Sequence, residues 1–132
     1  MGYRERVVPR VIGNKPDFME RGTIVQADLG KPTRGSEQAG QRPAVIVSAR
    51  AMTAGPTLVI IPCTTTQPGR PRRPYEVILA PEETGLPAES TALVHHIRVI
   101  DKRFILDRHR GRVTDSAMRR IDATIRLVLD VA

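Results

Sequence analysis

Two short polar stretches, Arg42-Pro43 and Cys63-Thr64-Thr65-Thr66, hold the side chains best suited to chemistry on a phosphate. A guanidinium can grip a phosphate through two parallel hydrogen bonds, and Pro43 restricts the backbone that presents Arg42. Positive charge held beside a phosphate that gains charge during a reaction is usually the largest catalytic contribution. The Thr64 hydroxyl can donate to a phosphate oxygen, but threonine also favours strand ends for structural reasons. Residue type alone therefore favours Arg42 and leaves both interpretations open for Thr64.

Two apolar runs position these residues. Residues 44–48 and 57–62 are almost unbroken apolar sequence, which is typical of strands covered on both faces. The turn sequence at 54–56 lies between the runs. In an antiparallel pair, Arg42 enters the first strand close to the point where Thr64 leaves the second. The sequence thus predicts that the two side chains meet at one polar edge of a sheet.

Alternating apolar residues predict further strands at 23–29 and 75–79. A strand that begins near Ser90 is expected to continue through His95-His96 to Ile100. Short strands are also expected at 104–106 and 110–113. Several short strands separated by turns favour a small barrel over an open sheet.

The last 19 residues change to a helical period. Thr114 is the expected N-cap, and Asp115 lies where the helix dipole favours negative charge. The apolar stripe consists of Met118, Ile121, Ile125, Val128 and Ala132. The arginines off this stripe are interpreted as a solvated face, with contact to nucleic acid as the alternative; they are Arg119, Arg120 and Arg126.

Two loops stand out. The stretch from Gly30 to Gln41 is longer than compact domains normally tolerate without a purpose. Residues 67–74 contain three prolines, which exclude a helix or a central strand, so an exposed basic loop is expected there. Its arginines are Arg70, Arg72 and Arg73. They suit contact with phosphates or with an acidic protein partner.

Composition limits the class of protein. With 132 residues the chain has the size of one domain, and a net charge of +7, mostly from arginine, favours a polyanionic partner. The single cysteine, Cys63, rules out an intrachain disulfide and is expected to be an inert small apolar residue, so a reducing cytoplasm fits best. No apolar run is long enough to span a bilayer, so no membrane association is expected. Aromatic residues make up only 3%, which argues against aromatic stacking as the main grip on a nucleic acid.

Metal chemistry is not expected. Metal-dependent phosphate cleavage needs converging carboxylates or histidines, whereas the acidic residues here are scattered. Neither an Asp-x-Asp nor a His-Glu-x-x-His pattern occurs. The sequence therefore predicts neither a metal nor another cofactor.

Several short motifs in a fixed order resemble the MazF/PemK toxins. They are Arg21-Gly22, Asp28-Leu29, Gly35-Ser36-Glu37-Gln38-x-Gly40-x-Arg42-Pro43, Pro62-Cys63-Thr64-Thr65, Gly85-Leu86-Pro87 and Ile97-Arg98-x-Ile100-Asp101-Lys102. Any one of these motifs is weak, but together they are specific. The resemblance covers residues 19–132. Residues 1–18 lie outside it and are expected to be a basic, poorly ordered extension, or alternatively an arm along a nucleic acid.

The resemblance implies an SH3-like, CcdB-like small β-barrel with a closing C-terminal α-helix, in a mainly β protein with helices (α+β). It implies a metal-free endoribonuclease of a type II toxin–antitoxin pair that cleaves single-stranded RNA and leaves 2',3'-cyclic phosphate and 5'-hydroxyl ends. A homodimer and a MazE-type antitoxin follow from the same resemblance.

Residue by residue, the resemblance places catalysis on Arg42 and Thr64. It places RNA contacts on Ser36, Glu37 and Gln38 of the long loop, for which turn formation is the alternative. Thr65 and Thr66 are expected to assist Thr64 at the phosphate. Since arginine is nearly always protonated, Arg42 is better explained as an electrostatic stabiliser, or as an acid for the leaving oxygen, than as a base.

The sequence departs from the family at His95-His96, where a Glu-Gln or Asp-Gln pair is usual. On a strand the two side chains would point to opposite faces, so one histidine, taken as His96, would face the RNA. An imidazole there can act as a general base or acid, or it can replace the usual glutamine as a hydrogen-bonding group. Arg98 and Asp101 are expected to form a structural ion pair beside it.

Two rival functions remain open at this level. A CcdB-like protein with this fold poisons DNA gyrase by binding and needs no RNA chemistry. A non-catalytic RNA- or partner-binding barrel would also account for the basic loops. The pair Arg42 and Thr64 is expected of a nuclease and is not required by either rival.

Overall fold

The computed structural model describes residues 19–31 and 39–132. The strands are β1 (Thr23–Asp28), β2 (Gln41–Ile46), β3 (Thr57–Thr65), β4 (Glu76–Leu79), β5 (Ser90–Leu93), β6 (Arg98–Asp101) and β7 (Ile105–Arg112). The helices are α2 (Arg50–Thr53), α3 (Pro81–Thr84) and α4 (Asp115–Leu129), with 3-10 turns η1 (Val94–His96) and η2 (Lys102–Phe104). The predicted basic extension, residues 1–18, lies outside the described residues.

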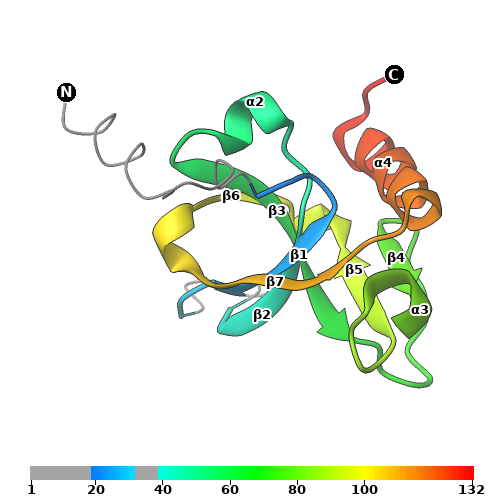
Figure 1. The fold of residues 1–132 in the computed structure, drawn as a ribbon. Coiled ribbons are helices and arrows are strands. Elements are labelled where there is room, and N and C mark those ends of the chain that lie inside the picture. Colours follow the sequence, from blue (N-terminus) through cyan, green and yellow to red (C-terminus); the bar gives the residue numbers. More distant parts are fainter. Residues whose placement is uncertain (1–18, 32–38) are drawn as a thin grey trace, which may run out of the picture.

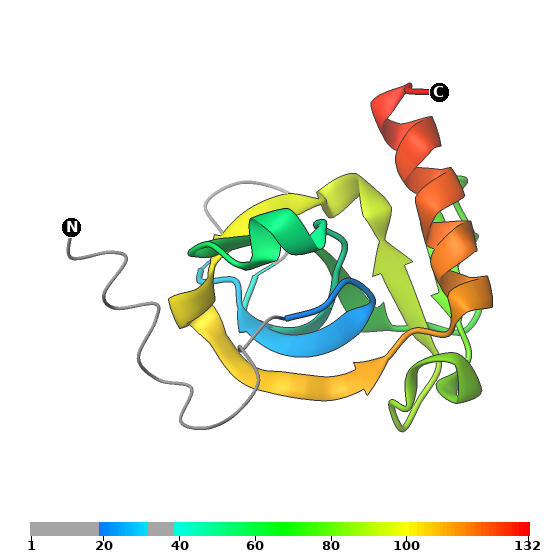
Figure 2. The same cartoon turned by 45° about the horizontal axis from the view of Figure 1, so that its top comes forward.

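The strands form one strongly curved antiparallel sheet in the order β4-β5-β3-β2-β1-β7, and β6 pairs with β3 beyond the end of β5 (Figure 1). Strands β1, β7, β6 and β3 curve around a common interior (Figure 2). Within the described strands, hydrogen bonding does not close this barrel, because β7 pairs with β1 and β6 pairs with β3. The predicted barrel-like α+β fold with a C-terminal helix is confirmed.

The central strands β2 and β3 are covered on both faces, as their apolar sequence predicts. On one face Val45, Ile61 and Cys63 belong to a core that includes Ile121 of α4. On the other face Ala44, Ile46 and Ile60 belong to the core inside the curved sheet. Successive residues of each strand therefore point into different cores. A shift of one position in the pairing would exchange the two sets of side chains, so the register of β2 and β3 is well defined.

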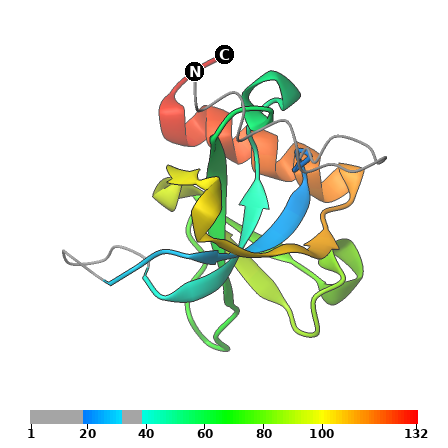
Figure 3. The same cartoon turned by 60° about the vertical axis from the view of Figure 1, so that its left-hand side comes forward.

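Helix α4 begins at the predicted cap. The Thr114 hydroxyl accepts a hydrogen bond from the Ala117 backbone N–H, and Ala117 and Ile121 are fully buried. The predicted apolar residues Met118, Ile125 and Val128 pack against the same core. The helix crosses behind the strands of the sheet (Figure 3). Because Arg120 donates to the Ile78 carbonyl and pairs with Glu83, this residue anchors α4 to β4 and α3 and does not belong to a purely solvated face.

Two expectations about local structure are wrong, and two short helices were missed. His95 and His96 lie in the 3-10 turn η1, because the strand ends at Leu93 and the chain turns before β6 begins. The two short strands expected at 104–106 and 110–113 are one strand, β7 (Ile105–Arg112), and irregularities in its pairing with β1 interrupt the alternation read from the sequence. The short helices α2 and α3 were not predicted, because four residues carry too little periodicity.

Candidate active site

Arg42 and Thr64 meet at one end of the curved sheet. Antiparallel pairing of β2 with β3 aligns Ala44 with Pro62, which brings the start of β2 to the end of β3. Arg42 Nη1 donates to Thr64 Oγ1 at 3.4 Å, and Arg42 Nε donates to the Ala39 carbonyl at 3.1 Å. Both side chains are half-buried, so each still reaches solvent. The predicted juxtaposition is confirmed, and one edge of the guanidinium is held by backbone.

A buried threonine supports this pair from the next strand. Thr91 of β5 is the register partner of Thr64, and only 2% of Thr91 is exposed. Its hydroxyl lies 2.9 Å from the hydroxyl of Thr66. The predicted site residue Thr66 therefore lies on the Thr64 face, tied to β5. Thr91 was missed from the sequence, because an isolated threonine in an apolar run carries no signal until its strand partner is known.

The neighbouring residue Thr65 does not join them. Side chains alternate along a strand, so Thr65 of β3 points to the face opposite Thr64, and it is exposed. The structure therefore separates Thr65 from the Arg42–Thr64 pair, and its predicted help at the same phosphate is not supported by this geometry. The predicted contacts Ser36, Glu37 and Gln38 lie outside the described residues, in the segment that leads to Ala39.

The arginines of the loop between β3 and β4 have different surroundings. Arg70 forms a 2.8 Å ion pair with Glu76, whose side chain is only 2% exposed. Arg73 Nη1 donates to the Tyr75 hydroxyl at 3.2 Å. Arg72 lines a separate cavity of about 520 Å³ against α4, together with Arg120. Arg73 therefore contacts Tyr75, Arg70 is tied to the start of β4, and Arg72 lines a cavity that Glu76 also borders.

His95 and His96 lie side by side, contrary to the expectation that they point to opposite faces. Their ring centroids are 4.2 Å apart, and the His95 ring is also 4.2 Å from the Tyr75 ring. Partial burial lowers the pKa of His95 below its usual value of 6.5, and the neighbouring charge of His96 adds to this effect. Both imidazoles therefore belong to one cluster of rings at the end of β5.

Cys63 and Asp101 have structural surroundings. Cys63 is buried in the core beside α4, and this burial raises the pKa of its thiol to about 12. The pairing seen for Asp101 is with Arg103, at 3.7 Å, and the Asp101 carboxylate also accepts from the Arg103 backbone N–H.

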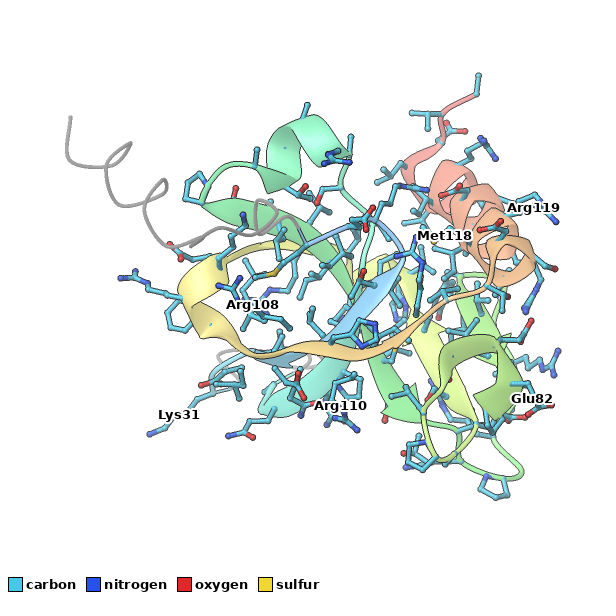
Figure 4. All side chains as sticks on the ribbon, in the orientation of Figure 1. Lys31, Glu82, Arg108, Arg110, Met118 and Arg119 are labelled. Carbon is cyan, nitrogen blue, oxygen red and sulfur yellow. The ribbon has the colours of Figure 1, made fainter. Side chains whose placement is uncertain are left out.

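Arg119 projects outward from α4 (Figure 4) and is exposed. In the part of the chain that the structure describes, no three histidine, cysteine or acidic residues gather as a metal site would require.

No helix among residues 19–31 and 39–132 combines the length and apolar character needed to cross a membrane.

Comparison with known proteins agrees with this geometry. Residues 20–129 match the family model of the PemK-like, MazF-like toxin of type II toxin–antitoxin systems. Endoribonuclease MazF9 of Mycobacterium tuberculosis is 36% identical over 120 residues, which cover 86% of this chain and 98% of that protein. Endoribonuclease EndoA of Bacillus subtilis is 28% identical, over 85% of this chain and 95% of the relative.

Solved structures show the same architecture. A crystal structure of MazF from Deinococcus radiodurans superposes with a TM-score of 0.70 at 23% identity, over 85% of this chain and 96% of that one. An endoribonuclease in complex with its cognate antitoxin, from a Mycobacterial species, gives a TM-score of 0.68 at 25% identity, over 86% and 96% of the two chains. The family match spans the sheet, α4 and the Arg42–Thr64 pair. The chain therefore belongs to the PemK-like, MazF-like toxins of type II toxin–antitoxin systems.

Proposed function

We propose that this toxin is a metal-independent endoribonuclease that cleaves single-stranded RNA at preferred sequences and leaves 2',3'-cyclic phosphate and 5'-hydroxyl ends. The observation that carries this proposal is the 3.4 Å contact between the Arg42 guanidinium and the Thr64 hydroxyl at a solvent-accessible edge. Relatives that cover most of the chain are named endoribonucleases, which supports the same activity.

RNA supplies its own nucleophile. The 2'-oxygen forms a bond to the adjacent phosphorus as the bond from phosphorus to the 5'-oxygen breaks, so no water is consumed in this step. The 2'-hydroxyl loses a proton, and the leaving 5'-oxygen gains one. The protein must therefore stabilise extra negative charge on the phosphate oxygens and assist two proton movements.

Arg42 and Thr64 suit the first task. The Arg42 guanidinium is oriented by the Ala39 carbonyl, which accepts from Nε, while Nη1 is directed towards Thr64. Donors fixed before the reaction stabilise developing charge without a reorganisation cost. Arg42 thus holds the phosphate and can protonate the leaving 5'-oxygen, while the Thr64 hydroxyl donates to a second phosphate oxygen.

The contacts of Arg42 and Thr64 do not identify the group that accepts the 2'-hydroxyl proton. The two histidines lie beyond the end of β5 and not beside Thr64. We therefore assign His96 an RNA-binding role, and a pH–rate profile of the His96→Gln protein tests the alternative. A normal profile with nearly full activity supports binding, whereas loss of the acidic limb of the profile would make His96 the base.

The partners follow from the family. We propose that the toxin acts in the cytoplasm as a homodimer and that an acidic, partly apolar tail of a MazE-type antitoxin occupies its RNA site. MazE–MazF complexes of Deinococcus radiodurans share the fold, and the net charge of +7 suits both an RNA strand and an acidic tail.

The test is a cleavage assay on a long RNA in the presence of EDTA. The intact protein is expected to cut, whereas Arg42→Ala and Thr64→Val lose most of the activity. Arg119→Ala is the matched control, because Arg119 is an exposed arginine on α4, away from the site. No cleavage by the intact protein, or equal cleavage by all four proteins, would overturn the proposal. End-labelling with polynucleotide kinase without prior phosphatase treatment checks for the 5'-hydroxyl.

A further inference from the structure

We infer that Tyr75, His95 and His96 form a platform on which a nucleobase of the RNA substrate stacks, near the scissile phosphate. This inference rests on the proposed endoribonuclease function and adds a base-binding subsite to it. Single-stranded RNA is commonly held by stacking its unpaired bases on aromatic side chains, including histidine. The chain has no tryptophan, two tyrosines, two phenylalanines and three histidines, and one tyrosine and two histidines are gathered here.

The rings form a continuous row. Tyr75 and His95 meet edge-on with their centroids 4.2 Å apart, at an interplanar angle of 61°, and His95 and His96 are again 4.2 Å apart. His95 is exposed, whereas Tyr75 and His96 are half-buried, so the row is accessible from solvent at its centre. A cluster that served only to fill the core would bury its middle ring.

The turn that carries the two histidines is anchored in the core. Val94, which precedes the histidines in η1, is fully buried in the core beneath α4. The Ile97 backbone N–H closes the 3-10 turn on the Val94 carbonyl. The rings are therefore presented by an anchored turn and lose little conformational entropy when a base is bound.

The charges around the row suit an RNA strand. Arg73 donates to the Tyr75 hydroxyl, and Arg70 pairs with Glu76, so the nearest carboxylate is already neutralised. Partial desolvation by the surrounding rings and the adjacent His96 lower the pKa of His95, which favours its neutral imidazole. A neutral imidazole has both a donor and an acceptor nitrogen, which can read the edge of a base. Arg73 uses one guanidinium nitrogen in the contact with Tyr75, so its other N–H groups can contact a flanking phosphate.

The row lies on the same path as the active site. Thr64 is paired in register with Thr91, and Leu93 two residues further along β5 is paired with Glu76, so these four side chains share one face. From Thr91 to Leu93, the last residue of β5, the strand advances roughly 7 Å at about 3.3 Å per residue, and η1 with the two histidines follows directly. An RNA strand with its scissile phosphate at Arg42 and Thr64 therefore reaches His95 with a nearby nucleotide.

The test uses a short RNA that contains the mapped cleavage site, in which one nucleotide at a time is made abasic. For the intact protein, one abasic position away from the scissile bond is expected to lower kcat/KM about tenfold, the size of one stacking contact. In His95→Ala the intact RNA should be cut about tenfold more slowly, and the same abasic position should then have little further effect. His95→Phe, which keeps a ring, should restore most of the activity on the intact RNA, and Arg119→Ala should behave as the intact protein does.

A direct binding measurement protects the test against an unstable variant. In the Arg42→Ala protein, RNA with 2-aminopurine at that position should lose fluorescence on binding, because stacking quenches this base. Combining Arg42→Ala with Tyr75→Leu should reduce the quenching. The platform is disproved if the abasic position lowers kcat/KM of the His95→Ala protein as much as that of the intact protein, and if Tyr75→Leu leaves the quenching unchanged. RNA cleavage itself stands in that case. If the intact protein cuts no RNA at all, the proposed function fails and the subsite fails with it.

Discussion

Arg42 and Thr64 are separated by 22 positions in the sequence, yet the guanidinium donates to the hydroxyl across the β2–β3 edge. A second contact, from Arg42 Nε to the Ala39 carbonyl, fixes the orientation of the same guanidinium. The planar fork of arginine can satisfy a backbone carbonyl and a phosphate at once, which a lysine ammonium cannot do with the same geometry.

Arg42→Lys should therefore be a poor replacement although it keeps the charge. We expect RNA cleavage to fall by roughly a hundredfold, close to the loss in Arg42→Ala, because a preorganised donor at this position is worth about two to three orders of magnitude. The measurement is kcat/KM on a defined RNA, with Arg119→Lys as the matched control. Activity of the lysine protein within a factor of three of the original would show that charge alone suffices.

Thr91→Val tests the hydroxyl pair beneath the site. Valine keeps the shape of threonine, so the change removes little besides the 2.9 Å contact with Thr66. We expect the free energy of unfolding to fall by about 1 kcal/mol. Urea unfolding of Thr91→Val, Thr66→Val and the double variant measures the coupling. Strictly additive effects would show that the two hydroxyls do not stabilise each other.

Gly111→Ala should destabilise the fold through a backbone collision. A Cβ on Gly111 of β7 would overlap the carbonyl oxygen of Thr84, the last residue of α3. Because that oxygen belongs to backbone and cannot rotate away, we expect a loss of about 1–3 kcal/mol or more, as for other overpacked sites. Gly30→Ala is the comparison: its φ of +77° adds strain, but nothing lies within 4 Å of its Cβ. Equal stability of Gly111→Ala and the original protein would contradict the close approach.

The free energy of unfolding should decrease in mild acid because of His95. Burial, followed by the charge of His96, lowers the pKa of His95 in the folded state, while Glu76 acts in the opposite direction and Arg73 and Arg70 add to the lowering. The unfolded chain therefore binds a proton more readily than the folded one once the pH drops through about 6.5, and stability decreases from there down to the folded pKa. Thermal unfolding between pH 7.5 and 5 should show a weaker pH dependence for His95→Phe. Parallel curves for the two proteins would disprove this role.

Cys63 should be unreactive until the protein unfolds. Burial in the core beside α4 raises the pKa of its thiol to about 12, so the thiolate is scarce at neutral pH. A thiol reagent such as DTNB is expected to label the chain fully in denaturant and only marginally under native conditions. Since Cys63 is the only cysteine, the absorbance reports on it alone. Rapid labelling of the native protein would mean that this core opens easily.

Local sequence pattern was enough to predict several elements of this fold. The apolar runs before Ser48 and before Cys63 predict buried strands because few polar atoms interrupt them, and the cap at Thr114 predicts where α4 begins. The Arg42–Thr64 contact also followed, because antiparallel pairing of two successive apolar strands brings the start of the first to the end of the second. The same local reading gave the wrong geometry for His95 and His96, because the end of β5 is set by its partners β3 and β4 and not by its own residues.

Strand pairing in the folded chain sets which residues from distant segments share one surface. Thr91 lies beside Thr64 and contacts Thr66 because β5 pairs with β3, and Tyr75 meets His95 because β4 pairs with β5. These relationships depend on strand pairing between segments that are distant in the sequence, where loop closure and core packing set the register and no local propensity does.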